Sequence, residues 1–396
     1  MNRFLLTRNE KLCSGCYNCV NSCPTNCISM KINEEGFFYP EFNDADCIKC
    51  GICISVCHMQ HVPKFNKQNQ HFYAAISKDL KSIKRSSSGG VFYQIANKIL
   101  EEQGVVYGAK LDIKERHLHH CGINQVDDIS QLQGSKYIQS QLYDTFVNIK
   151  SDLSAKRKIL FVGTPCQVDA LYYFLGKKNI DSLVTIDLLC HGVPSERMFR
   201  EYVLYLENKH KGELVDINFR DKEKFGWSIT LSYDIKKKNK VKRHYTPAAI
   251  SPYFFSFLRG YILRENCYNC QFSSINRVGD ITLADFWGVE NALPSIEKDK
   301  GVSLVIINTE KGQRIFDDLA TTLHIYEVSK EEATCQNPNF FEATKRPLER
   351  EVIFKELNNL GYKKIYKKYL LNPRRFKTLI KTSFLWKFYK QYIKGN

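Results

Sequence analysis

No apolar run in this sequence of 396 residues approaches the roughly 20 residues that a helix needs to cross a bilayer. Residues 1–8 also lack the long apolar core of a secretory signal peptide. We therefore expect a soluble, cytoplasmic protein, in a compartment where thiols stay reduced. The length favours two or three domains, and a hydrophobic content of 43% is enough to fill a sizeable core.

Basic residues outnumber acidic ones, and most of the excess positive charge lies at one end of the chain. The formal net charge is +16, and residues 341–396 hold fifteen Lys and Arg against four Glu, so this tail alone carries +11. A charge concentrated at one end indicates docking rather than an anionic substrate. No nucleic-acid-binding fold is recognised in the sequence, so we expect no nucleic acid partner.

The tail over residues 340–396 is expected to be helical, and it interleaves lysines with aromatic residues. Such helices could lie on an anionic membrane surface, which would place the protein at the inner face of the membrane. The alternative is that the aromatic side chains pack on the body and the lysines face water. The aromatic residues concerned are Tyr362, Tyr366, Tyr369, Phe376, Phe384, Trp386, Phe388 and Tyr389.

Nine of the fifteen cysteines lie between residues 13 and 57, and eight of them fall in two runs with one spacing rule. Each run reads C-x2-C-x2-C-x3-C, a pattern that supplies three thiolates to one 4Fe-4S cluster and a fourth to its neighbour. A zinc site would leave the third and fourth cysteine of each run without a role, and a disulfide framework suits small secreted domains. The runs are Cys13, Cys16, Cys19 and Cys23, then Cys47, Cys50, Cys53 and Cys57.

The crossover of the fourth cysteine assigns the ligands of the two clusters. Cluster one takes Cys13, Cys16, Cys19 and Cys57, and cluster two takes Cys47, Cys50, Cys53 and Cys23. His58 stands where the first run has Pro24, so the second loop is expected to turn differently. Cys27 has no place in either set and is interpreted as a small buried hydrophobic residue.

A second domain follows a polar linker over residues 60–70. Its loop Ser87-Ser88-Gly89-Gly90 leads into a helix that starts at residue 91. Such a loop can hold a phosphate, because free N–H groups and the helix dipole favour an anion. An ordinary capped helix is the other interpretation. Lys136 and Tyr137 could likewise hold a phosphate and stack on a ring, or be a plain surface pair.

Periodicity predicts the remaining elements of this domain. We expect strands over 73–76, 105–109, 158–163, 183–189, 280–288 and 302–307, the last being the final clear strand. Helices are expected over 140–153, 168–175, from 195 to about 208 and over 253–263. Residues 215–240 follow a period of two and predict a β excursion with a turn at 236–240. His117, His119 and His120 are expected on the water-facing side of a strand or hairpin rather than at a metal.

Four further cysteines form a third set, in which Cys166 and Cys190 each follow a buried parallel strand and Cys267 and Cys270 form a C-x2-C pair. Because parallel strands present ligands at their carboxyl ends, the first two could be neighbours. Together the four thiolates could hold a third 4Fe-4S cluster or a zinc ion, or they could be separate buried cysteines.

Six short motifs in order give residues 73–290 a resemblance to the beta subunit of coenzyme F420-reducing hydrogenase and its relatives (FrhB-like), a flavoprotein family. They are Ser87-Ser88-Gly89-Gly90, Gly134-Ser135-Lys136-Tyr137, Gly163-Thr164-Pro165-Cys166-Gln167, Leu189-Cys190-His191, Cys267-x2-Cys270 and Asp280-Ile281-Thr282. Long bacterial relatives are more similar still, with an N-terminal two-cluster domain and the motifs Phe219-Arg220-Asp221-Lys222 and Asp285-Phe286-Trp287-Gly288.

The resemblance implies FAD near the serine- and glycine-rich loops and a 4Fe-4S cluster on the third cysteine set. His191 is a candidate general acid, although it could instead bond a cluster sulfur or cap a helix. Hydrogenase subunits lack the β excursion and the basic tail, so a deazaflavin substrate is not carried over. The expected cofactor residues are Ser87, Ser88, Gly89, Gly90, Ser135, Lys136, Tyr137 and Asp280.

The resulting expectation is a mixed α/β and α+β protein. Residues 1–62 form a two-cluster ferredoxin-type domain, 71–335 a flavin and cluster domain with parts 71–155 and 156–335, and 340–396 the tail. The function expected is an oxidoreductase that passes electrons from a ferredoxin-like donor through clusters and FAD to an organic acceptor. Family context suggests cell-surface polysaccharide metabolism. The alternative is an electron-transfer subunit that serves a partner enzyme.

Overall fold

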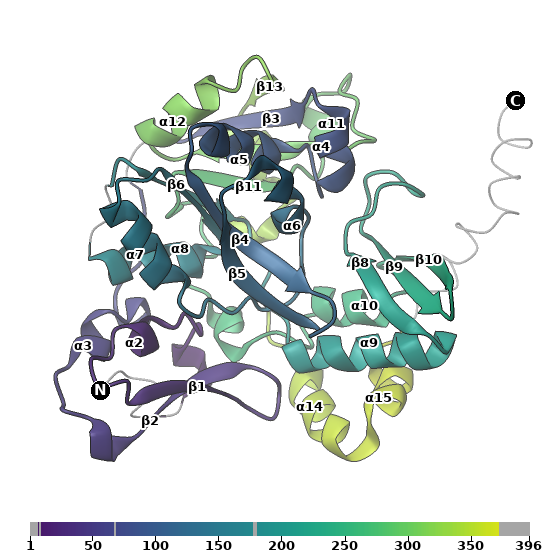
Figure 1. The fold of residues 1–396 in the computed structure, drawn as a ribbon. Coiled ribbons are helices and arrows are strands. Elements are labelled where there is room, and N and C mark those ends of the chain that lie inside the picture. The colour runs from purple at the N-terminus through teal and green to yellow at the C-terminus, as the bar shows by residue number, and fades with distance from the viewer. Residues whose placement is uncertain (1–6, 8, 67–68, 177–179, 372–396) are drawn as a thin grey trace, which may run out of the picture.

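The computed structural model describes residues 7, 9–66, 69–176 and 180–371. A small N-terminal unit lies beside a large sheet, which carries most of the helices (Figure 1). A three-stranded sheet and a pair of C-terminal helices lie against a long helix, α9 (Figure 1). The chain is thus the mixed α/β protein expected from the sequence, preceded by a small ferredoxin-like segment.

The N-terminal unit is a hairpin with two single-turn helices. Strands β1 (Ile28–Ile32) and β2 (Phe38–Phe42) pair antiparallel. Helices α2 (Asn18–Asn21) and α3 (Ile52–Ser55) each contain the third cysteine of a run. Gly15 and Gly51 have φ values of +71° and +76°, a backbone conformation that favours glycine. Each of these glycines lies within a cysteine run and allows the chain to turn there.

Eight strands form the large sheet in the order β13-β3-β12-β11-β7-β6-β4-β5. The four central strands, β11, β7, β6 and β4, run parallel, and the outer strands add antiparallel pairs. Parallel order brings the carboxyl ends of the central strands to one edge. The strands are β3 (His71–Ser77), β4 (Val105–Asp112), β5 (His117–Ile123), β6 (Ile159–Gly163), β7 (Leu183–Leu188), β11 (Ile281–Asp285), β12 (Ser303–Ile307) and β13 (Leu323–Val328).

The helices start at recognisable capping residues. Thr164 and Gln167 form a capping box at the start of α8, and Pro165 occupies its first turn. Ser195 caps α9 through a bond from the Met198 N–H group. Helices around the large sheet are α4 (Leu80–Arg85), α5 (Val91–Glu101), α6 (Ile129–Leu132), α7 (Thr145–Ser154), α8 (Pro165–Leu175), α11 (Val289–Ala292), α12 (Glu310–Asp317) and α13 (Lys330–Thr334), and the others are α9 (Glu196–His210), α10 (Pro252–Leu258), α14 (Glu349–Leu360) and α15 (Tyr362–Tyr369).

Most predicted elements are confirmed, and several expectations are corrected. Strand β13 follows the strand that was expected to be last, and its buried and exposed positions do not alternate regularly. Helix α7 begins at Thr145, α8 begins at Pro165 and α10 ends at Leu258. The segment 60–70 is no free linker, because Asn66 bonds to the main chain of Arg277 and Gly279.

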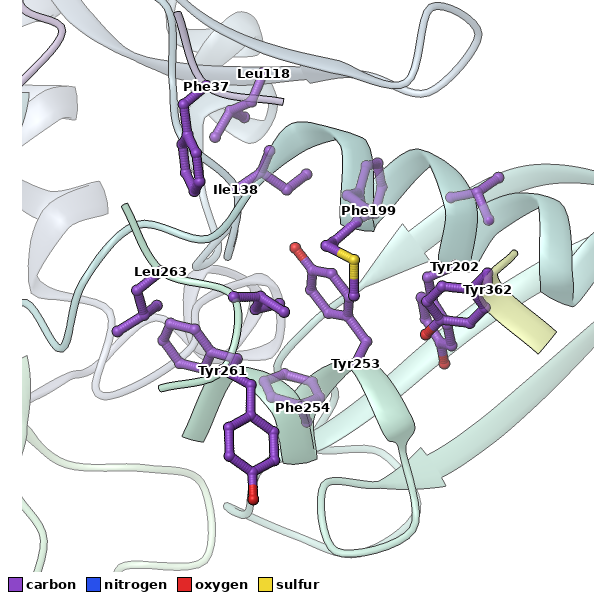
Figure 2. Close-up of a cluster of buried hydrophobic side chains, with 14 of the residues drawn as sticks. Phe37, Leu118, Ile138, Phe199, Tyr202, Tyr253, Phe254, Tyr261, Leu263 and Tyr362 are labelled. Carbon is purple, nitrogen blue, oxygen red and sulfur yellow. The ribbon is translucent and has the colours of Figure 1, made fainter. Parts of the chain in front are cut away.

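The β excursion forms the three-stranded sheet of β8 (Glu213–Asn218), β9 (Thr230–Lys237) and β10 (Lys240–Pro247). It pairs as two antiparallel hairpins with β9 in the middle. Figure 2 shows the hydrophobic cluster between this sheet, α9 and α10, to which the N-terminal unit contributes Phe37. The N-terminal unit and the body therefore share one core, which fixes their relative placement.

The described part of the tail packs on the body. Tyr362 and Ile365 of α15 are buried, while the lysines of that helix are exposed. The Tyr362 ring lies against Tyr202 and Tyr205 of α9, at centroid distances of 6.4 Å and 5.9 Å. Up to residue 371, then, the aromatic residues face the core, and residues 376–389 lie outside the described residues. Among the helices that are described, none is both long and apolar enough to cross a membrane.

Candidate electron-transfer and acceptor site

A cavity in the N-terminal unit is lined by the four cysteines assigned to cluster one. Its other walls are the loop over 12–18, Met30, Pro40 and Met59. Apolar walls suit an iron–sulfur centre, whose potential depends on exposure and on nearby hydrogen bonds. The structure thus brings together Cys13, Cys16, Cys19 and Cys57, as the crossover assignment requires.

The second set lies nearer the surface. Cys23, Cys47 and Cys53 pack on one hydrophobic core, while Cys50 is exposed. Cys27 is buried as expected, but its sulfur lies 3.4 Å from that of Cys23. A fifth thiol therefore stands beside the cluster-two residues, which its spacing in the sequence did not indicate.

The third set assembles at the end of the large sheet. Strands β6 and β7 are parallel neighbours, so Cys166 at the start of α8 and Cys190 after β7 lie at the same edge. Burial raises the pKa of Cys190 well above its usual range, and the thiols of Cys267, Cys166 and Cys270 raise it further. The four sulfur atoms are therefore close enough to interact.

The three histidines on β5 do not form a metal centre. His120 is buried, with its ring nitrogens 2.7 Å from the Ser140 hydroxyl and 3.0 Å from the Val162 carbonyl, unlike the water-facing position expected. His117 contacts Glu196 at 2.8 Å. In the described ranges, no group of three His, Cys, Asp or Glu side chains is arranged around a single metal ion. A cubane spreads its ligands over four iron atoms, so this finding does not test the cluster sets.

Arg264 connects cluster one to the third set. Its guanidinium is fully buried and donates to the Cys13 carbonyl at 2.9 Å, the Phe38 carbonyl at 3.0 Å and Gln139 at 3.1 Å. It also lies 4.0 Å from the Tyr39 ring centroid. Cys267 is only three residues further along the chain. One buried cation therefore stands between two cysteine sets, and the sequence motifs did not reveal it.

His58, the residue that replaces proline in the second run, fastens the N-terminal unit to α8. Its Nδ1 lies 3.0 Å from the Asp169 carboxylate, its Nε2 lies 2.8 Å from the Ser14 hydroxyl, and both side chains of the His58–Asp169 pair are fully buried. Asn18 adds a bond to the Ala170 carbonyl. Because α8 also carries Cys166, the same helix positions both cysteine sets.

The two expected cofactor loops meet above the sheet. The Ser135 N–H group donates to the Ser87 hydroxyl at 2.6 Å. A side chain at Gly89 would meet the Ala75 carbonyl at 2.2 Å, so this glycine is required by close packing on β3. Gly90 has a φ of +87° and starts α5. Ser88 donates to the Val302 carbonyl at 2.6 Å.

Lys136 and Tyr137 are more enclosed than the sequence suggested. The Lys136 ammonium donates to the carbonyls of Leu132, Gln133 and Gly134 and so closes the end of α6. Burial lowers the pKa of Lys136 to about 7. Tyr137 packs its ring against Phe219, Phe254 and Phe257. Neither residue is a plain surface group, and Tyr137 turns its hydroxyl toward Arg220.

Arg220 is the centre of this site. Its Nη1 donates to Asp285 at 2.5 Å and to the Tyr137 hydroxyl at 3.2 Å, which joins three sequence motifs. Its guanidinium lies 5.3 Å from the Trp287 ring centroid, and Trp287 stacks on Trp227 at 4.9 Å. The Lys222 ammonium bonds the Ser88 carbonyl at 2.9 Å. The residues around Arg220 therefore reach the Ser87–Gly90 loop.

Asp280 lies away from that centre, whereas His191 packs on Phe257, one of the rings around Tyr137. Asp280 stands at the opposite end of β11 from Asp285, where it accepts bonds from Thr185, Thr309 and Lys311. The structure therefore does not bring it to the other expected cofactor residues. The ring of His191 contacts the Phe257 carbonyl at 3.2 Å and borders an open cavity formed with residues 338–345. Burial lowers the pKa of His191, and a catalytic role for it stays a prediction.

Comparisons with known proteins agree with both parts of this site. Residues 156–333 match the family model that describes the C terminus of the coenzyme F420 hydrogenase/dehydrogenase beta subunit. Residues 12–60 match the model of a 4Fe-4S dicluster domain. The first match contains all four cysteines of the third set, and the second contains both cysteine runs.

Two curated proteins are similar over parts of the chain. The uncharacterized protein MJ1349 of Methanocaldococcus jannaschii is 25% identical over 199 residues, which are 42% of this chain and 54% of that protein. Ketoisovalerate oxidoreductase subunit VorC of Methanothermobacter marburgensis is 37% identical over 51 residues, which are 12% of this chain and 65% of that protein. The chain thus spans less than two thirds of either relative.

Among solved structures, a chain of the F420-reducing NiFe hydrogenase complex from Methanosarcina barkeri aligns with a TM-score of 0.46 and 15% identity. The alignment covers 76% of this chain and 96% of that one. The family resemblance does not depend on this alignment. The two family-model matches support an iron–sulfur protein of oxidoreductase type, in which residues 156–333 resemble the C-terminal domain of the coenzyme F420 hydrogenase/dehydrogenase beta subunit and a 4Fe-4S dicluster domain precedes them.

Proposed function

We propose that the protein is an iron–sulfur flavoprotein oxidoreductase that accepts electrons from a redox protein and reduces an organic acceptor. The observation that carries this proposal is that the cysteines assigned to cluster one and the third cysteine set lie close to each other, connected through Arg264 and α8. Arg264 and α8 hold both sets against one another, and Cys16, Cys166 and Cys270 pack on the same hydrophobic core. Cys50 is exposed, so a protein donor would deliver electrons at the cluster-two cysteines.

Two parts of the body fit the expected cofactors. The third cysteine set offers four buried or half-buried thiols that interact with one another. The site around Arg220 contains two buried guanidinium nitrogens and the Trp227 indole nitrogen, for which no acceptor exists among the described residues. Buried donors without partners are costly, and a bound ligand would satisfy them. When bound, clusters supply one-electron transfer, and a flavin converts it to the two-electron chemistry of organic substrates.

The chain's own residues then have distinct tasks. Cys166, Cys190, Cys267 and Cys270 would hold the third cluster. The loops 87–90 and 134–137, joined by the bond between Ser135 and Ser87, would hold FAD. Phe254 and Phe257 keep water from the Tyr137 side of this site. A protein donor or reduced ferredoxin is the expected partner, and a role in cell-surface polysaccharide metabolism stays a prediction.

Iron, sulfide and flavin analysis of anaerobically purified protein tests this function. We expect about twelve iron atoms per chain in the wild type, because each cubane holds four. A Cys190→Ser/Cys270→Ser variant should retain about eight iron atoms, and the electron paramagnetic resonance signals of the dicluster domain should be unchanged. Cys335→Ser is the matched control, since Cys335 is exposed and outside all three sets.

Flavin content decides the second half of the proposal. Anaerobic reconstitution with FAD should give a stoichiometric complex with the absorbance bands of an oxidised flavin beside those of the clusters. Protein that holds its clusters but binds no flavin would refute the flavoprotein assignment. Protein whose iron content is the same in the wild type and in Cys190→Ser/Cys270→Ser would refute the third cluster.

An electron-transfer subunit without its own acceptor is the second candidate. It is favoured by the name of VorC, which is a subunit of a larger oxidoreductase. This candidate predicts that the purified protein reduces only a partner protein. The unsatisfied donors around Arg220 favour the first candidate, because a pure relay has no need of them.

A further inference from the structure

Arg220 has one edge of its guanidinium in use and the other free. Nη1 donates hydrogen bonds to both Asp285 and Tyr137, whereas Nε and Nη2 have no partner within the residues that the structure describes. The side chain is only 2% exposed, so bulk water does not solvate these two nitrogens. They leave the guanidinium on the same side, as the pair of donors that matches two oxygens of a carboxylate or phosphate.

A second unsatisfied donor lies in the same group of residues. The Nε1 of Trp227 is buried and has no partner among the described residues, and its ring stacks on Trp287. Trp287 in turn lies beside the Arg220 guanidinium. The two indoles and the guanidinium therefore form one contiguous group, which contains three buried donor nitrogens without a partner among the described residues.

The charged residues of this group are the cations Arg220 and Lys222 and the carboxylates Asp285 and Asp221. Asp285 offsets the charge of Arg220, and Lys222 is near enough that Arg220 lowers its pKa, after the larger effect of burial. Asp221 is turned to β9, where it accepts bonds from Ser232 and from the Glu223 N–H group. Neither carboxylate occupies the Nε–Nη2 edge of Arg220, so this edge is left for the oxygens of another anion.

We propose that the Nε–Nη2 edge of Arg220 binds a carboxylate or phosphate group of the electron acceptor, and that Trp227 donates a further hydrogen bond to that ligand. The inference rests on the proposed function and names the chemical class of its substrate, an anionic organic molecule. The loop that joins β8 to β9 supplies Arg220, Lys222 and Trp227, so the β excursion contributes the specificity of the site.

Anion binding can be measured by tryptophan fluorescence. The chain has three tryptophans, so Trp386→Phe leaves Trp227 and Trp287 as reporters beside Arg220. Inorganic phosphate and acetate are titrated into anaerobic Trp386→Phe protein at constant ionic strength, with chloride as the balancing salt. We expect a saturable change with phosphate or acetate and none with chloride. A buried water at Arg220 would give no response to any of these anions, and that result would overturn the inference.

The variant Arg220→Lys keeps a positive charge for Asp285 but loses the paired donors. It should weaken anion binding about tenfold or more, since two charge-assisted hydrogen bonds are removed. Trp227→Phe keeps the ring and removes one donor, so it should weaken binding less while Trp287 still reports. Arg243→Lys is the matched control, because Arg243 is 41% exposed and pairs with Asp234 on the three-stranded sheet. Equal anion affinity in wild type, Arg220→Lys and Trp227→Phe would contradict the proposal.

The same titration in FAD-loaded protein separates the acceptor from the cofactor. A response that persists after FAD loading supports an acceptor site. A response lost on FAD loading, together with weaker FAD but unchanged riboflavin binding in Arg220→Lys, assigns the edge to the cofactor phosphates and overturns the acceptor assignment. Protein that binds no flavin would refute the proposed function, while the titration of flavin-free protein would still decide the anion site.

Discussion

Asp187 and Arg277 form a fully buried ion pair next to the third cysteine set. The Asp187 carboxylate accepts bonds from the Arg277 guanidinium at 2.9 Å, from Thr282 at 2.7 Å and from the Gly279 N–H group at 2.9 Å. Arg277 also bonds the Leu188 carbonyl at 3.1 Å. The pair thus ties the segment after Cys270 to β7, the strand that leads to Cys190.

Arg277→Met should lower the free energy of unfolding by about 3–5 kcal/mol, because it leaves a buried carboxylate without its counter-charge. Anaerobic urea unfolding measures the change. The exposed Arg243→Met should cost about 1 kcal/mol or less. An Asp187→Leu/Arg277→Met double variant should recover part of the loss, and a single variant as stable as the wild type would contradict this role.

His120 makes stability depend on pH. Burial lowers the pKa of His120 to about 4, although the bond to the Val162 carbonyl opposes the shift. The folded pKa lies below the unfolded value of about 6.5, so this contribution is complete above pH 6.5 and is lost as the pH falls toward 4. At pH 5 the loss is about 2 kcal/mol.

The measurement is urea unfolding of the wild type and of His120→Gln at pH 7 and pH 5. The wild type should lose about 2 kcal/mol more than the variant over this interval. A variant with the same pH dependence as the wild type would show that His120 is not the titrating group.

At the scale of elements, helices α14 and α15 close the lower face of the body. Ile365 of α15 is fully buried, in the cluster that also contains Tyr202 and Tyr362, whereas Val352 of α14 is 42% exposed. The amphipathic pattern of these helices fits burial against α9. The sequence left open whether the aromatic residues meet the body or a membrane, and up to residue 371 they meet the body.

Ile365→Ala should therefore destabilise the protein by about 2–5 kcal/mol through loss of buried surface and creation of a cavity. Val352→Ala is the matched control and should cost about 0.5 kcal/mol. Thermal unfolding under anaerobic conditions compares the two. Equal effects would indicate that α15 does not pack on α9 in solution.

For the whole molecule, Arg264 joins the N-terminal unit to the body and places a buried positive charge between two cysteine sets. Positive charge and hydrogen bonds near a cluster raise its reduction potential. Arg264→Gln should shift the potential of cluster one to more negative values, and Arg264→Lys should shift it less, because the charge is kept.

Potentiometric titration followed by electron paramagnetic resonance measures these shifts. A Gln variant with intact clusters and an unchanged potential would contradict the electrostatic role of Arg264. Arg259→Gln is the matched control, since Arg259 is exposed at the end of α10 and contacts Tyr261 rather than a cysteine set.

Local sequence patterns were sufficient to predict many of the secondary-structure elements and the cysteine sets of this protein. The spacing of two cysteine runs predicts two clusters, because thiolates that share a cubane must come from short loops and a crossover residue. The βα units predict parallel strands with Cys166 and Cys190 at one edge, and the structure has β6 and β7 as parallel neighbours. Short-range periodicity and capping carry this information, which is why most strands and helices were found.

Only the tertiary structure decided which distant residues meet. Arg220 joins Asp285 and Tyr137 across 65 and 83 residues, and Arg264 reaches Cys13 across 251. Asp280 lies at the opposite end of β11 from the cofactor site to which the sequence assigned it. The Lys136 ammonium donates its hydrogen bonds to carbonyl groups at the end of α6. Buried polar groups must form hydrogen bonds, and in these cases the partner is distant in the sequence. Short-range sequence patterns therefore cannot identify it.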